Sequence, residues 1–218
     1  MNSSLGFEPE KITTSRDALE LEQSHTKDKE PENENSLYEI IKFLVIALII
    51  VVPIRMFVAQ PFIVSGASME NTFNHNEYLI VDQLTYQFNS PERGEVVIFR
   101  YPQDPSKFFI KRVIALPGDT ISIDGTDVTI INEEFPDGFT IDEPYVKSME
   151  RNTYLEETLL DREFFVLGDN RDESSDSRIW GVLQEEYIVG RAWLRLFPPA
   201  AISFRPGHHD HTKALQDN

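Results

Sequence analysis

A serine and a lysine about forty residues apart are the residues of this chain best suited to chemistry. Ser68 follows Gly66 and Ala67, two small residues that leave its backbone N–H accessible as part of an oxyanion hole. Lys111 lies in the run FFIKRVIA (108–115), which is so apolar that its ammonium group is poorly solvated. Burial disfavours the charged form of a lysine and lowers its pKa. A serine beside a neutral lysine is a nucleophile with its own base, so the pair is a candidate for covalent catalysis.

The composition of the chain limits which other catalytic and binding sites it could contain. The chain has no cysteine, which excludes thiol nucleophiles, disulfides and cysteine-based zinc sites. Four of the five histidines lie in polar terminal segments, so a Ser-His-Asp triad would have to use His75. A metal could bind the cluster His208, His209 and His211, but we interpret these residues as part of a disordered tail and expect no metal and no cofactor. The formal net charge of −17 argues against a nucleic-acid partner, because phosphate binding needs a basic surface.

One apolar segment near the N-terminus predicts a membrane helix. Residues 1–36 are acidic and polar, which is typical of a disordered segment. Every residue from 43 to 54 is then apolar, between Lys42 and Arg55. A span needs about 20 mostly apolar residues, so we expect one transmembrane helix over 37–59, with both cations reaching toward the headgroups. The alternative is a cleaved secretory signal, which the long acidic leader suits poorly.

The remainder of the chain, residues 60–205, reads as a mainly β catalytic domain. Runs rich in β-branched and aromatic residues alternate with Pro, Gly, Asn and Asp, which is typical of strands and turns. The expected strands cover residues 78–81, 95–99, 108–115, 120–123, 128–131, 163–167 and 187–197. We therefore predict an antiparallel β-barrel or sandwich-like domain, with 133–161 as a loop or small insertion and 206–218 as a polar C-terminal tail.

Taken singly, the chemical motifs have ordinary explanations: a turn serine, a lysine at a strand edge and a polar, ion-paired loop. Together they occur in the order of a known family. The blocks are SGASMENT (65–72), EYLIVDQLTY (77–86), RGEVVIFRYP (93–102), FFIKRVIALPGD (108–119) and GDNRDESSDSRIWG (168–181). Over residues 38–205 the chain resembles bacterial type I signal peptidases, membrane-bound serine proteases with a Ser/Lys dyad.

The resemblance assigns roles residue by residue. It implies that Ser68 is the nucleophile, that Lys111 is the general base and that Ser174 orients the lysine. The oxyanion hole would use the backbone N–H of Ser68 and a donor at Gly66, where other members have serine. Structural support of the site would come from Asp169, Arg171, Asp176 and Arg178. Shallow pockets for small substrate side chains would be lined by Phe62, Val64, Met69, Phe109 and Ile110.

The resemblance also implies partners and a location. The substrates would be preproteins whose signal peptides end in Ala-x-Ala, and the enzyme a monomer in the lipid bilayer of the bacterial inner membrane. The β-domain would lie outside the cytoplasm, an orientation that the flanking charges barely indicate. The chain departs from the family at Glu70-Asn71, where proline usually precedes the threonine. Two other classes compete: a self-cleaving repressor-type peptidase, which would need a DNA-binding domain and no span, and an inert, membrane-tethered binding domain.

Overall fold

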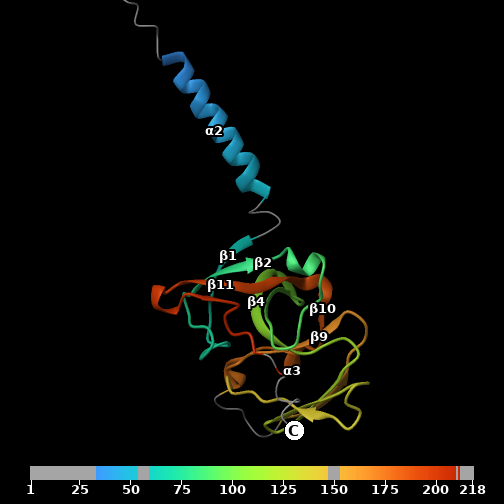
Figure 1. The fold of residues 1–218 in the computed structure, drawn as a ribbon. Helices are drawn as coiled ribbons and strands as arrows, with labels where there is room; N and C mark the ends of the chain where they lie inside the picture. Colours follow the sequence, from blue (N-terminus) through green and yellow to red (C-terminus); the bar gives the residue numbers. More distant parts are fainter. Residues whose placement is uncertain (1–32, 54–58, 147–152, 210, 212–218) are drawn as a thin grey trace, which may run out of the picture. The chain divides into compact units, whose positions relative to one another are not determined.

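The computed structural model describes residues 33–53, 59–146, 153–209 and 211 (Figure 1). The chain divides into two units, residues 1–49 and 50–218, which are described separately. Of the segment 1–36 that was predicted to be disordered, residues 1–32 lie outside the described residues and 33–36 lie in a helix.

The helix α2 covers Asn33–Pro53. Its window Ser36–Pro53 has a mean hydropathy of 2.2 and is long and apolar enough to cross a membrane, by length and composition. The helix begins four residues before the predicted start at residue 37, and it ends at Pro53 within the described part. Ala59, predicted as the last residue of the span, lies in a strand instead.

The larger sheet has eight strands and is antiparallel throughout (Figure 1). Its order is β1-β2-β11-β3-β4-β9-β10, with β12 paired to β11. The strands are β1 (Ala59–Ile63), β2 (Tyr78–Asp82), β3 (Val96–Tyr101), β4 (Asp104–Ala115), β9 (Glu163–Leu167), β10 (Leu183–Gln184), β11 (Ile188–Phe197) and β12 (Ser203–Phe204). Among the described strands β1 and β10 end the path without pairing to each other, so the sheet is open. The prediction of a mainly antiparallel β domain is confirmed, and the described strands do not close into a barrel.

A second, four-stranded sheet has the order β7-β6-β5-β8. Its strands are β5 (Thr120–Asp124), β6 (Asp127–Ile131), β7 (Phe139–Thr140) and β8 (Tyr154–Thr158). The segment 133–161, predicted as a loop or small insertion, therefore supplies two strands. The sequence did not predict these strands, because β7 has only two residues and β8, YLEET, is mostly polar and exposed.

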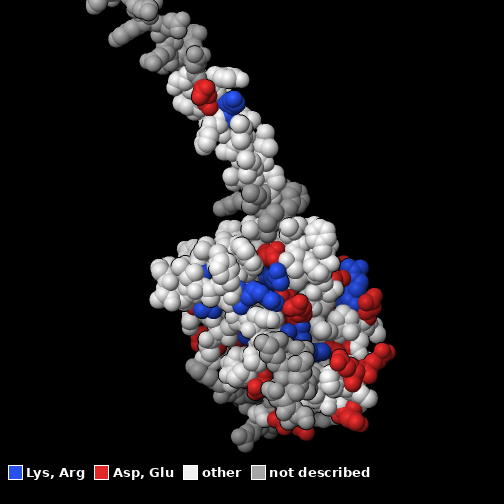
Figure 2. Space-filling view, in the orientation of Figure 1, with Lys and Arg blue, Asp and Glu red and all other residues white. Residues whose placement is uncertain are grey.

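Short helical turns complete the described fold. They are η2 (Thr85–Gln87), η3 (Arg171–Glu173), α3 (Ser177–Trp180), η4 (Glu185–Tyr187) and η5 (Pro199–Ala201). Acidic side chains are spread over the lower part of the face seen in Figure 2, where the four-stranded sheet lies, as expected from an acidic composition that extends along the chain.

Three buried clusters form the core, and β4 contributes to or contacts each of them. The first joins the two sheets, with Ile114 and Leu167 from one packed against Ile121 and Ile130 from the other. The second includes Met69 and Phe73, from the loop that follows β1. Burial of these two side chains anchors the loop that carries Ser68, because apolar side chains gain free energy when removed from water.

Within the predicted polar tail 206–218, the described residues 206–209 and 211 are packed against the β-domain, which corrects the prediction for these residues. Pro206 and His211 are buried, and the carbonyl of Gly207 accepts a hydrogen bond from the Arg112 guanidinium. The N–H of His209 donates to Gly94 O (3.4 Å). A Cβ on Gly94 would lie 1.8 Å from the carbonyl oxygen of His209, so only glycine permits this approach. Residues 210 and 212–218 lie outside the described part.

Candidate active site

Ser68 lies in a tight loop between β1 and β2. The N–H of Glu70 donates to Ala67 O (2.9 Å), and the N–H groups of Thr72 and Phe73 donate to Met69 O (3.0 and 2.7 Å). Asn71 has a φ of 86°, a left-handed conformation that asparagine tolerates and that the ring of proline forbids. The departure of the chain from the family motif before Thr72 therefore coincides with a backbone turn that proline could not make.

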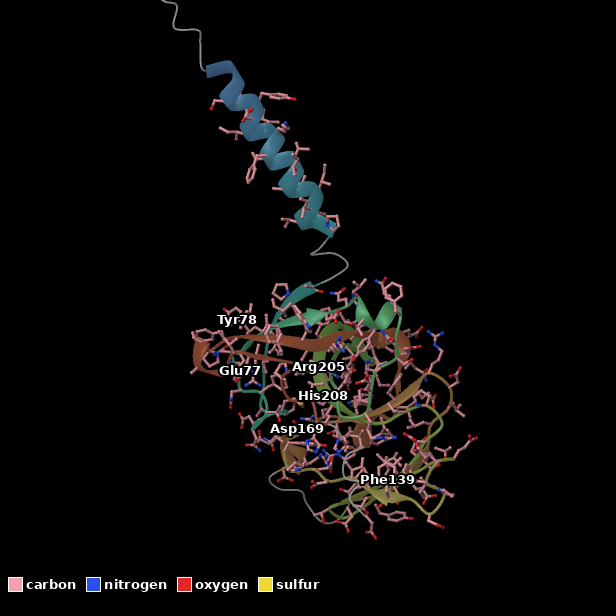
Figure 3. The ribbon with its side chains drawn as sticks, in the orientation of Figure 1. Glu77, Tyr78, Phe139, Asp169, Arg205 and His208 are labelled. Atoms are coloured by element: carbon pink, nitrogen blue, oxygen red, sulfur yellow. The ribbon has the colours of Figure 1, made fainter. Side chains whose placement is uncertain are left out.

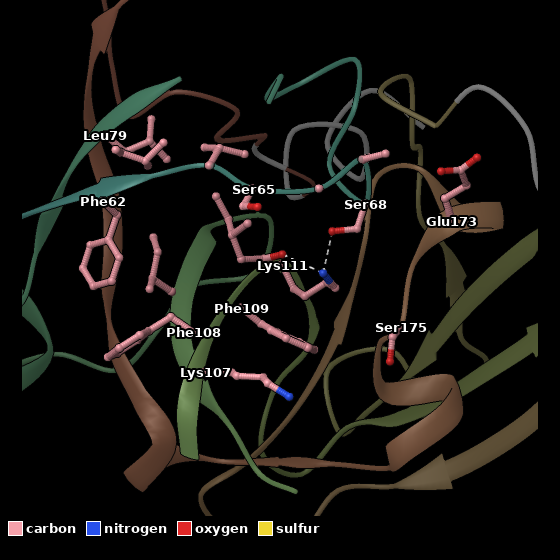
Figure 4. Close-up of a pocket in the computed structure, with 16 residues that line it drawn as sticks. Phe62, Ser65, Ser68, Leu79, Lys107, Phe108, Phe109, Lys111, Glu173 and Ser175 are labelled. Atoms are coloured by element: carbon pink, nitrogen blue, oxygen red, sulfur yellow. Dashed lines mark hydrogen bonds between the residues drawn. The ribbon is translucent and has the colours of Figure 1, made fainter. Parts of the chain in front are cut away.

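Lys111 reaches Ser68 from β4. Its Nζ donates to Ser68 Oγ (2.7 Å) and to the carbonyl of Ile110 (2.9 Å). Figure 4 shows the two side chains pointing toward each other, with Phe62 and Phe108 on one side of the lysine and Glu173 and Ser175 on the other. Lys111 is 3% exposed, and its Nζ lies 5.4 Å from the centre of the Phe109 ring. The two residues that the sequence singled out are in direct contact.

The environment of Lys111 favours the neutral amine. Burial lowers the pKa of Lys111 from its ordinary 10.5 to about 8, and the negative charges of Asp176 and Asp169 oppose this shift. Asp176 is held by Arg178, whose Nε and Nη2 both lie 2.8 Å from its oxygens. Asp169 is held in the same way by Arg112. Because an arginine offsets each carboxylate, desolvation dominates at the lysine.

The neighbouring residue on β4, Arg112, points to the other face of the strand, as strand alternation predicts. It is 1% exposed and binds Asp169 and the carbonyls of Gly94 and Gly207. The second oxygen of Asp169 also accepts a hydrogen bond from the hydroxyl of Thr72. Figure 3 labels Asp169 within the β-domain, and this residue is fully buried. This carboxylate therefore ties the serine loop to β4.

The loop after β9 is stabilised by its own ion pairs. Asp176 accepts a hydrogen bond from Gly168 N (3.0 Å) and caps α3, while Arg178 Nη2 donates to Arg171 O (2.7 Å). Arg171 Nε donates to Gly168 O (3.0 Å), and its guanidinium also pairs with Glu143. The structure thus brings together the four predicted support residues. Glu143, in the segment predicted as a loop, carried no signal in the sequence.

Ser174 lies near the site but does not bond to the lysine. Its Oγ is buried without a hydrogen-bond partner among the described residues. A Cβ built on Gly168 would lie 2.2 Å from Ser174 Oγ and 2.5 Å from Ser68 O. Gly168 therefore lies against both serines, with no room for a side chain. The hydrogen bond to Lys111 that the resemblance implies is absent from this structure.

Gly66, predicted to supply a second oxyanion donor, uses its N–H elsewhere. The group donates to Nδ1 of His75 (3.3 Å), and Gly66 has a φ of 100°. His75, weighed above as a triad member, thus contacts the main chain of Gly66. The expected free donor at Gly66 is not present in this arrangement.

A cleft of about 460 Å³ opens beside Ser68 and Lys111. Four of the five residues predicted to bind substrate line it: Phe62, Val64, Phe109 and Ile110. The fifth, Met69, is buried beneath the loop in the core, with 1% exposure. Lining residues that the sequence did not indicate are Ile63, Ser65, Leu79, Ile98, Lys107, Phe108, Glu173 and Ser175. The cleft walls are mainly apolar, and a nucleophile and a buried base meet at the cleft.

Residues 37–197 match the family model described as "Signal peptidase, peptidase S26". The chain belongs to this family. A probable signal peptidase I-2 of Synechocystis sp. is 37% identical over 179 residues, which cover 79% of each chain. Signal peptidase I P of Bacillus subtilis subsp. natto is 32% identical over 78% of this chain and 95% of its own. A crystal structure of a signal peptidase I from Enterococcus faecalis V583 is 26% identical, covers 47% of this chain and 97% of that chain, and has a TM-score of 0.40. This signal peptidase is a serine peptidase that removes signal peptides from proteins.

Proposed function

We propose that this signal peptidase cuts preproteins after a small residue, at Ala-x-Ala sequences, by an acyl-enzyme mechanism with Ser68 as nucleophile and Lys111 as base. The observation that carries the proposal is the 2.7 Å contact between Lys111 Nζ and Ser68 Oγ at a lysine that is 3% exposed. When the amine is neutral, its lone pair accepts the hydroxyl proton along this same line.

The acylation step then balances within the dyad. Lys111 takes the proton of Ser68 as Oγ bonds to the scissile carbonyl carbon, and the carbonyl oxygen becomes an oxyanion. Collapse of this intermediate breaks the C–N bond, and the protonated Lys111 gives its proton to the departing amine. The mature protein leaves with the new N-terminus, and the signal peptide remains as an ester on Ser68.

Deacylation uses the same lysine. Lys111, neutral again, takes a proton from a water molecule whose oxygen attacks the ester carbonyl. The C–O bond to Ser68 then breaks, the proton returns to Oγ, and the signal peptide is released with a free carboxylate. The apolar walls supplied by Phe62, Val64 and Ile110 favour small uncharged side chains on the substrate.

The membrane helix raises the effective concentration of enzyme and substrate at the membrane surface. We infer that α2 anchors a monomer in the bacterial inner membrane, with the β-domain outside the cytoplasm. A signal peptide is itself apolar and is held at the same bilayer. Tethering enzyme and substrate to one surface raises their effective concentration without any new contact.

The proposal is tested by cleavage of an Ala-x-Ala preprotein with the detergent-solubilised full chain. Wild type, Ser68→Ala and Lys111→Ala are compared after their folding is checked by circular dichroism. We expect cleavage by the wild type and none by either variant. Activity that survives in Lys111→Ala would overturn the dyad, and a folded but inactive wild type would favour the binding-domain alternative.

A further inference from the structure

Asn170 holds the peptide unit that precedes the serine. Its side-chain Nδ2 donates to Ala67 O (3.1 Å), and its backbone N–H donates to Ser68 O (3.0 Å). The two accepting carbonyls lie on either side of the Ser68 Cα. Asn170, which is 102 positions after Ser68 in the sequence (170 minus 68), therefore binds the main chain both before and after the nucleophile.

The geometry of a peptide unit turns this contact into control over the Ser68 N–H. A trans peptide is planar, and its N–H points opposite to its C=O. Fixing the Ala67 carbonyl toward the Asn170 amide therefore directs the Ser68 N–H away from Asn170. The N–H of Glu70 donates to the same carbonyl (2.9 Å), which adds a second restraint on this peptide plane.

The Ser68 N–H is itself available. No hydrogen bond among the described residues uses it as donor, and Ser68 lines the cleft. The N–H of Gly66 is directed to His75 instead. An oxyanion that forms on a substrate bound to Ser68 thus depends heavily on the Ser68 N–H, and this donor is useful only while its direction is fixed before the reaction.

We propose that Asn170 is a positioning residue for the oxyanion hole: its side-chain amide fixes the Ala67–Ser68 peptide plane so that the Ser68 N–H faces the reacting carbonyl. This inference rests on the proposed function of Ser68 as nucleophile. Asparagine is required because its carboxamide donates through Nδ2, whereas an aspartate of the same shape only accepts. An aspartate would set a negative charge against the Ala67 carbonyl oxygen.

The surroundings of Asn170 keep it in place. Gly168 allows its own loop to approach the Ser68 carbonyl, since a Cβ there would lie 2.5 Å from Ser68 O. Asp169 is held by Arg112 and by the hydroxyl of Thr72. The carbonyl of Asn170 accepts a hydrogen bond from Glu173 N (3.2 Å). Three consecutive residues, 168–170, thus position the serine loop, and Asn170 is the one whose side chain acts on the peptide plane.

The kinetic test compares Asn170→Ala and Asn170→Asp with a matched variant, Asn74→Ala. Removal of a whole oxyanion donor costs about 10²–10³ in kcat, so misdirection of the Ser68 N–H is expected to lower kcat by about 10- to 100-fold with KM little changed. The pH midpoint of Asn170→Ala should equal that of wild type, because Lys111 keeps its contacts. Asn74→Ala removes an amide hydrogen bond to Glu77 (3.0 Å) in the same loop, a contact that does not involve the Ser68 peptide unit, and its kcat should stay within about twofold of wild type.

A spectroscopic test does not depend on the substrate. Residues 67–68 are the only Ala-Ser pair in the sequence, so labelling alanine carbonyls with ¹³C and serine nitrogens with ¹⁵N selects this one peptide unit in an NMR spectrum of the full chain in detergent. We expect one sharp signal in wild type and in Asn74→Ala, and a broadened or split signal in Asn170→Ala.

The outcomes separate this inference from the proposed function. An Ala67–Ser68 signal that is unchanged in Asn170→Ala would overturn the positioning role, whether or not the wild type cleaves a preprotein. A changed signal with an unchanged kcat in an active enzyme would overturn it as well. Loss of kcat with unchanged KM and a changed signal is the result expected.

Discussion

Arg112 and Asp169 form a two-point ion pair in the interior of the β-domain, with Nε 2.9 Å from Oδ1 and Nη2 2.6 Å from Oδ2. Both side chains are 1% exposed. The pair joins β4, which carries Lys111, to the loop that carries Asn170. It also offsets one of the two negative charges that raise the pKa of Lys111. One contact thus contributes to both the position and the protonation of the proposed dyad.

Loss of this pair should be costly for folding. Arg112→Met leaves Asp169 buried without its cation, and breaking a buried pair by removing one partner costs about 3–5 kcal/mol. Denaturant unfolding of the full chain in detergent measures the loss. The double variant Arg112→Met/Asp169→Asn should recover part of it, because no charge is then left unpaired. A loss below about 1 kcal/mol in the single variant would contradict the role given to the pair.

Removal of the second arginine should change the pH dependence of cleavage. Arg178→Gln frees the negative charge of Asp176, which raises the pKa of Lys111, so the pH at half-maximal kcat/KM should move upward by about 1. Arg162→Gln is the control, since it removes an exposed pair with Glu185 on the surface. Equal midpoints for Arg178→Gln and wild type would show that Asp176 does not influence the lysine.

The lowered pKa of Lys111 also predicts a dependence of stability on pH. The folded-state pKa of about 8 lies below the ordinary 10.5, so the unfolded chain binds more protons between these values and the free energy of unfolding should rise with pH across that window. The full difference corresponds to roughly 3 kcal/mol. Lys111→Met lacks this titration. From pH 8 to pH 10.5 the free energy of unfolding of wild type should therefore rise relative to that of the variant. Parallel curves over that range would contradict a buried, neutral lysine.

Gly168 is expected to tolerate no side chain. In Gly168→Ala the new Cβ would lie 2.2 Å from Ser174 Oγ and 2.5 Å from Ser68 O, so the serine loop must shift. A misplacement of about 1 Å at a reacting group can cost about 10² in rate, and we expect kcat to fall by about this factor. Gly118→Ala is the control, with no atom within 4 Å of its Cβ and a strained φ of 85°. A similar loss of kcat in both variants would show that the loss does not come from the contacts of a Cβ at residue 168.

The sequence predicted best those strands whose own residue pattern indicates a strand. The alternation of β-branched and aromatic residues located β2, β3, β5, β6 and β9 within one or two residues. It missed β1, which contains Pro61, and β8, whose residues are mostly polar. Strand patterns are set by burial on one face, so a strand with little buried surface leaves little trace.

Contacts between distant segments could not be read from the sequence. The C-terminal residues looked like a tail because their burial depends on donors from Arg112, almost a hundred positions away. The hold of Asn170 on Ala67 and the contact of His75 with Gly66 likewise require the folded backbone. In contrast, Lys111 could be identified from the sequence, because its apolar neighbours lie on the same strand. The burial that makes a lysine a base is provided by that strand itself.

The proposed mechanism depends on a neutral, buried Lys111 as the base for Ser68. It is tested most directly by kcat/KM for cleavage of an Ala-x-Ala preprotein as a function of pH, measured over the range in which the full chain stays folded. We expect kcat/KM to rise with pH through a midpoint of about 8 and then to level off, because the deprotonated amine accepts the serine proton. A midpoint near about 6.5, the ordinary value for a histidine, or a profile without a midpoint between pH 7 and 9, would contradict it.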